Sequence, residues 1–88
     1  MGNLSKLPNI GAKLEKQLFD VGIISVEELK NAGSREAWLR ILQQDPTARI
    51  MRLFALEGAI QNVRWHCLND VTKESLKDFY HKHKGTDD

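Results

Sequence analysis

The sequence predicts a small all-α domain, and three features carry this prediction. Apolar residues recur at helical spacing in several segments, and no segment shows the alternation of a strand. Glycines and capping residues separate these segments at short intervals, as they do at helix ends. With 88 residues, of which 41% are hydrophobic and 28% charged, the chain has room for one core. We expect five helices, counting the N-terminal turn separately, in a single domain over residues 1–84, with a flexible tail at 85–88.

The first helix follows a tight turn. Pro8 fixes its own backbone, while Asn9 and Gly11 tolerate positive φ better than most residues, so the three together favour a turn. Every fourth residue beyond the turn is apolar, which predicts one buried helical stripe. The stripe consists of Ile10, Leu14 and Leu18. Gly22 then suits the left-handed position just after a helix, and Ile23 can fold back onto it.

Two short helices are expected next. Ser25 and Glu28 have the spacing of a capping box, in which each side chain bonds to a free amide at the helix start. This helix covers roughly residues 26–32 and ends at Gly33, and Ser34 can cap the next one. The apolar face of that third helix is formed by Ala37, Trp38, Ile41 and Leu42. We expect Trp38 in the core, with one partner for its indole N–H.

A longer central helix is predicted from Thr47 to about Asn62, because Asp45 and Pro46 interrupt the pattern before it. Its small residues, Gly58 among them, should let another helix approach closely. Glu57 either pairs with Arg64 or Arg35 or lies on an exposed edge. The predicted core residues are Leu14, Leu18, Leu29, Leu39 or Ile41, Leu53, Phe54, Leu56 and Ile60.

The last helix should be capped by Asn69 or Asp70 and continue through Tyr80, with Val71 on its apolar face. The polar residues 81–84 suggest a frayed end. Cys67 is the only cysteine, so it cannot form an internal disulfide, and we expect it to be a buried small hydrophobe.

The turn at the start is the candidate functional site. The order of turn, helix, glycine and capped helix is found in helix-hairpin-helix proteins, where backbone N–H groups at a helix start can hold one phosphate oxygen. The candidate phosphate or DNA contacts are Asn9, Ile10, Gly11, Ala12, Lys13 and Lys16. The alternative is that the Leu7–Lys13 segment only starts a helix, since function must be argued from a site and not from a fold.

Composition excludes several function classes. The formal net charge is +1, which supplies no large basic field for tight DNA binding. The chain lacks the spacing of a zinc site, a phosphate-binding glycine loop and a nucleophile with its base, so we expect no enzyme, metal, cofactor or small-molecule substrate. No apolar run could span a membrane, and the N-terminus does not resemble a secretory signal. We therefore expect a cytoplasmic protein.

Two runs of residues resemble a known family. Over roughly residues 4–76, the chain resembles the C-terminal domain of the TfoX competence regulators of bacteria. The resemblance is carried by LPNIGAKLEKQLFDVGIISVEELKNAG and, after a short helix, by FALEGAIQNVRW. The resemblance implies an all-helical fold similar to tandem helix-hairpin-helix domains, and a link to regulation of DNA uptake or transcription in longer relatives. It carries over no catalytic residue.

Two departures from DNA-binding hairpins weaken a DNA function. Asn9 stands where such hairpins usually carry glycine, and the second expected hairpin, near Asp45, reads DPTA with an acid where a phosphate would approach. We therefore expect a non-catalytic regulatory or protein-interaction module that contacts a protein partner or a second copy of itself. The alternative is weak, sequence-independent DNA binding through the Leu7–Lys13 hairpin.

Overall fold

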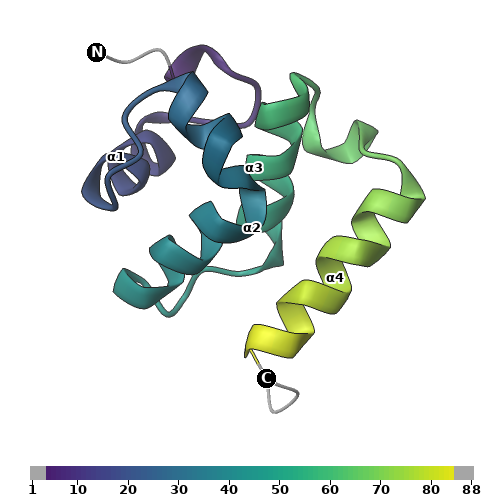
Figure 1. The fold of residues 1–88 in the computed structure, drawn as a ribbon. Helices are drawn as coiled ribbons and strands as arrows, with labels where there is room; N and C mark the ends of the chain where they lie inside the picture. The colour runs from purple at the N-terminus through teal and green to yellow at the C-terminus, as the bar shows by residue number, and fades with distance from the viewer. Residues whose placement is uncertain (1–3, 85–88) are drawn as a thin grey trace.

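Helices form where the local sequence favours them. The computed structural model describes residues 4–84, and over these residues it has four α-helices and two 3₁₀ turns but no strand, which confirms the all-α class (Figure 1). The elements are η1 (Leu4–Lys6), α1 (Ala12–Asp20), α2 (Val26–Gln44), α3 (Ile50–Gln61), η2 (Trp65–Cys67) and α4 (Asp70–Lys84). The predicted tail at 85–88 lies outside the described residues.

The core lies between α2 and α3, with α1 on one side of this pair and α4 on the other (Figure 1). Most of the predicted core residues are buried, and Leu39 and Ile60 are half-buried and pack against the core. The buried ones are Leu14, Leu18, Leu29, Ile41, Leu53, Phe54 and Leu56. Helical spacing was therefore sufficient to find the inner faces of α1, α2 and α3.

The end of α1 has the predicted glycine stop. Gly22 has φ of +87°, and its N–H donates to the Phe19 carbonyl at 3.0 Å. The N–H of Ile23 donates to the Leu18 carbonyl at 2.8 Å, and the Ile23 side chain is buried. These two bonds are those of a Schellman motif, which satisfies carbonyls that the helix end leaves free.

The predicted count of five helices is wrong, because the two helices expected on either side of Gly33 form one element, α2. Ser25 caps it by accepting from Glu28 N–H at 3.1 Å, while the Glu28 carboxylate accepts from Ile24 N–H instead of closing the box on Ser25. Gly33 has φ of 85° and ψ of 161°, so α2 is kinked there. The hydroxyl of Ser34 donates to Glu57 at 2.6 Å, a tertiary contact where the sequence predicted a helix cap.

The start of α3 and the end of α4 differ from prediction. α3 begins at Ile50, three residues after the predicted Thr47, because residues 45–48 fold into a turn. Asn69 caps α4 by accepting from Thr72 N–H at 2.7 Å. α4 then continues to Lys84, through the residues expected to fray. Val71 is 79% exposed and does not belong to the packed face of α4.

Trp38 holds α4 against the domain. Its side chain is buried, as predicted, and its ring centroid lies 6.0 Å from that of Phe79 and 5.6 Å from that of Tyr80. The expected partner for the indole N–H is not found among the described residues. Within residues 4–84, aromatic packing and burial therefore carry this contact.

Candidate functional site

The predicted hairpin contains a residue in the left-handed conformation, and it is Asn9, with φ of 72°. The preceding η1 turn leads into it, and Ile10 N–H donates to the Leu7 carbonyl at 3.4 Å. Gly11 instead has an extended backbone, with φ of −96° and ψ of −172°. Asparagine therefore provides the positive φ that glycine would provide in the usual form of such a turn.

The side chain of Asn9 points into the domain and joins the hairpin to the end of α3. Its Oδ1 accepts from Trp65 N–H at 3.1 Å. Its Nδ2 donates to the Val63 carbonyl at 3.0 Å and to the Ala55 carbonyl at 3.5 Å. One amide thus satisfies backbone groups of both polarities at the end of α3 and the start of η2. We call this set of contacts the Asn9 clamp.

Gly58 makes room for the Asn9 clamp. A Cβ atom at this position would lie 2.5 Å from Asn9 Nδ2, 2.8 Å from the Val63 carbonyl oxygen and 3.2 Å from the Cα of Trp65. The prediction that small residues in α3 admit a neighbouring helix is therefore wrong for Gly58. Its close neighbours are the hairpin asparagine and the chain that leaves α3.

The candidate phosphate contacts divide into exposed and buried groups. Gly11, Ala12 and Lys13 are exposed, and Gly11 is the N-cap of α1 without a side-chain bond to the first turn. Ile10 is 5% exposed, and the amide of the Asn9 side chain is engaged in the clamp. The start of α1 at Gly11, Ala12 and Lys13 therefore lies at the surface, where its free amides and its positive dipole end can meet one anion.

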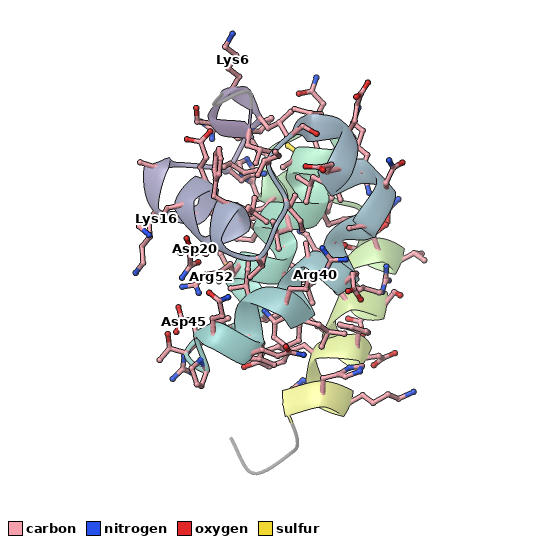
Figure 2. The ribbon with its side chains drawn as sticks, turned by 60° about the vertical axis from the view of Figure 1, so that its left-hand side comes forward. Lys6, Lys16, Asp20, Arg40, Asp45 and Arg52 are labelled. Carbon is pink, nitrogen blue, oxygen red and sulfur yellow. The ribbon has the colours of Figure 1, made fainter. Side chains whose placement is uncertain are left out.

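Charges around this turn are mixed. Lys6 and Lys16 are exposed and project away from the molecule (Figure 2). Lys16 pairs with Asp20 at 3.3 Å on α1, and both side chains are largely solvated, so the pair contributes little to stability. Glu15 lies in the first turn of α1 and accepts from Ser5 N–H at 3.3 Å. An acid at that position disfavours a phosphate at the same helix end.

The second turn, at Asp45, is also held by a polar side chain. Oδ2 of Asp45 accepts from Gln17 of α1 and from Arg52 of α3, each at 2.9 Å. Oδ1 accepts from the N–H of Thr47 at 3.1 Å and from the Thr47 hydroxyl. The carboxylate thus stabilises the turn that precedes α3, and its hydrogen bonds connect this turn at the end of α2 to α1 and α3. We call these contacts the Asp45 clamp.

The surroundings of Asp45 favour its ionised form. The Thr47 hydroxyl, then Arg52 and then Gln17, hold the pKa of this carboxyl well below its usual range. All three donate hydrogen bonds, which stabilise the carboxylate relative to the acid. The acid in the DPTA segment is therefore neutralised by Arg52 within the domain. The sequence analysis identified Asp45 as a departure from a DNA-binding hairpin. It did not identify Gln17 or Arg52 as hydrogen-bond partners of Asp45.

The side chains of Glu57 and Cys67 also differ from prediction in their contacts or exposure. Glu57 pairs with neither Arg64 nor Arg35, since it accepts from the Ser34 hydroxyl and from Gln61, each at 2.6 Å. The expectation that Cys67 is buried is wrong, because it is exposed in η2. Periodicity could not place Cys67, since η2 is a short turn outside the main helices.

Within residues 4–84, no set of three or more histidine, cysteine or acidic side chains is grouped closely enough to hold a metal ion. None of the helices in this part of the chain has the length and apolar character needed to cross a membrane.

Comparison with other proteins identifies relatives at both the sequence and the structure level. The model of the TfoX C-terminal domain matches residues 1–80. Protein Sxy of Escherichia coli strain K12 is 36% identical over 76 residues, which are 86% of this chain and 36% of Sxy. The chain therefore spans about a third of the length of this curated relative.

Two crystal structures from Listeria monocytogenes have the same fold. An uncharacterized protein in a triclinic form is 48% identical, with a TM-score of 0.93 and 96% of each chain covered. A protein of unknown function in a tetragonal form is also 48% identical, with a TM-score of 0.90, and the match covers 92% of this chain and 99% of that one. The likeness to tandem helix-hairpin-helix domains stays a prediction. Because the family model covers most of its length, this chain belongs to the TfoX C-terminal domain family, which relates it to the competence regulators.

Proposed function

We propose that this domain is a non-enzymatic regulatory module of the cytoplasm that acts through contact with a protein partner. One observation supports this best: the polar side chains of both turns, Asn9 and Asp45, bond to the domain itself. Neither is left to contact phosphate or to take part in a reaction. What the domain offers to other molecules is then its surface, including the exposed apolar side chains of Ile24, Met51 and Val71.

Family membership supports a regulatory role. The domain is similar to about a third of Sxy, so a unit of this size occurs within a longer protein of the family. Contact with a protein partner needs a surface with an apolar centre and a polar rim.

Site-specific photocross-linking in living cells tests the proposal. A photoreactive amino acid is placed in turn at Ile24, Met51 and Val71, and at the exposed Lys77 of α4 as a matched control. We expect a discrete protein adduct from at least one apolar position and none from the control. Equal, diffuse adducts from all four positions would contradict the proposal.

Weak, sequence-independent DNA binding is the second candidate, and the uncapped first turn of α1 favours it. A short duplex at low salt would shift the backbone amide signals of residues 10–13, and the shifts would fade as salt rises. Lys13→Glu would abolish them, whereas Lys77→Glu would not. We expect affinity no tighter than about 10–100 μM at physiological salt, because the net charge is near neutral. Submicromolar, sequence-selective binding would make DNA binding the better description.

A further inference from the structure

A small cavity lies between α2 and α4, away from both turns. Its volume is about 230 Å³. It is lined by Arg35 of α2 and by Ser75, Asp78, Phe79 and Lys82 of α4. None of these residues belongs to the Asn9 clamp, to the Asp45 clamp or to the first turn of α1. The cavity is therefore a separate feature of the surface, which we call the Arg35 cavity.

Arg35 lies at this cavity without an acidic partner. It is half-buried, and none of the ion pairs formed within residues 4–84 involves it. Its Nη2 donates to the Ser75 hydroxyl at 2.6 Å, which is a neutral acceptor. A guanidinium has five N–H donors, and its hydrogen bonds to a carboxylate are about twice as strong as those between neutral groups. The remaining donors of Arg35 can therefore hold a carboxylate from outside the chain.

Two contacts hold the guanidinium in place before any partner binds. Its Cζ lies 5.9 Å from the centroid of the Phe79 ring, which is the distance of a cation–π contact. The Phe79 ring packs in turn against buried Trp38, with the ring centroids 6.0 Å apart. The hydrogen bond to Ser75 is the second contact. Because a fixed guanidinium loses less side-chain freedom on binding, it suits a carboxylate better than a mobile surface cation does.

The charges at the Arg35 cavity favour a ligand with one negative charge. Lys82 is exposed there and forms no ion pair in the described part of the chain. Asp78 also lines the cavity, and its carboxylate repels anions. Two basic side chains and one acidic side chain leave a single positive charge. A carboxylate balances this charge, whereas a phosphate group with nearly two negative charges exceeds it.

We propose that the Arg35 cavity receives the carboxylate of an acidic side chain from a protein partner. The carboxylate accepts hydrogen bonds from the Arg35 guanidinium, whose planar fork matches two oxygens, and Lys82 provides a second positive charge. The methylene groups of the acidic side chain contact the half-buried Phe79 ring. This inference rests on the proposed function, since it names a feature of the partner.

Titration of labelled protein with N-acetyl-glutamate amide, which has one side-chain carboxylate and no other charge, tests the inference by nuclear magnetic resonance. We expect concentration-dependent shifts of the Arg35 Nε–H signal and of the Ser75 and Phe79 backbone amides, which fade as salt rises. N-acetyl-glutamine amide has the same shape without the charge and should bind at least ~10-fold more weakly. Equal shifts with both compounds, or none up to ~50 mM, would overturn the inference. Tighter binding of inorganic phosphate than of the glutamate compound would also overturn it.

Matched variants separate the cavity from general effects of charge. Arg35→Gln should weaken binding of the glutamate compound at least ~10-fold, whereas Arg64→Gln, which removes an exposed arginine outside the cavity, should leave it unchanged. Asp78→Asn should strengthen binding, because it removes the acid that repels the ligand. If Arg35→Gln does not fold by circular dichroism, Lys82→Gln takes its place, and weaker binding is again expected. Equal binding by the cavity variant and Arg64→Gln, or weaker binding by Asp78→Asn, would overturn the inference.

Failure of this inference differs from failure of the proposed function. Protein adducts in cells without binding of the glutamate compound would overturn this inference alone and leave the proposed function standing.

Discussion

The turn at Asn9 and the turn at Asp45 are both fixed to the domain by side-chain hydrogen bonds, but the two side chains differ in chemistry. Each turn is held by one short polar side chain that bonds to distant parts of the domain. Asn9 uses a neutral amide that donates and accepts, whereas Asp45 uses a carboxylate that only accepts. The Asn9 clamp therefore depends on shape and backbone conformation, and the Asp45 clamp depends on charge. Substitutions at the two turns should respond differently to added volume, to side-chain removal and to pH.

The largest effect is expected at Gly58, which adjoins the Asn9 clamp. Gly58→Ala should lower the free energy of unfolding by about 2–3 kcal/mol, because backbone atoms of Val63 and Trp65 cannot rotate away from the new methyl group. This cost exceeds the gain of ~1 kcal/mol in helix propensity. Urea unfolding, followed by circular dichroism, measures this change in the free energy of unfolding. The difference in stability between Met51→Ala and Met51→Gly, at an exposed position of the same helix, controls for propensity. An unchanged Gly58→Ala variant would refute the close approach.

Removal of the Asn9 side chain should cause the second-largest loss in the free energy of unfolding. Asn9→Ala should cost about 2 kcal/mol, because it leaves the Val63 carbonyl and the Trp65 N–H unpaired and puts alanine at positive φ. Asn9→Gly loses the same hydrogen bonds without the conformational cost, so it should be the milder of the two. Equal losses for both variants would show that φ contributes nothing. The Trp65 amide signal should shift in both.

The Asp45 clamp should be recognised by its pH dependence. The pKa of Asp45 is lowered in the folded state, so its contribution to stability is complete above about pH 4, its ordinary unfolded range, and is lost as pH falls through the folded value. Asp45→Asn should therefore be less stable than the parent at pH 7, and the difference should narrow at low pH. Thermal unfolding between pH 7 and 2 measures this. Asn9→Ala provides the comparison, since its deficit should not change with pH, and parallel curves for all three proteins would contradict the assignment.

The smallest effect is expected at Cys67, outside both clamps. Because the thiol is exposed, a thiol reagent should modify the native protein at nearly the rate of the denatured one. Cys67→Ser should change stability by no more than about 0.5 kcal/mol, as for other exposed positions. Slow native modification would show that the thiol is sheltered in solution.

The sequence by itself determined those features that depend on a few neighbouring residues. The glycine stop after α1, the Ser25 cap, the kink at Gly33 and the buried faces of α1, α2 and α3 all follow from local backbone preference and from the 3.6-residue period. The exposed residues of the candidate site, Gly11 to Lys13, could also be placed at a helix start from sequence. These preferences are set within one or two turns of chain, so no distant residue can easily reverse them.

Only the tertiary structure decided how distant polar groups meet. Asn9 bonds to Val63 and Trp65, more than fifty residues away, and no local pattern could have indicated either partner. The same holds for Gln17 with Asp45, for Ser34 with Glu57 and for the exposure of Cys67. Polar side chains have several potential partners of similar energy, and the packing of the helices selects among them. Composition and spacing predicted which segments fold into helices, but the contacts of the Asn9 and Asp45 clamps arise only when those helices pack.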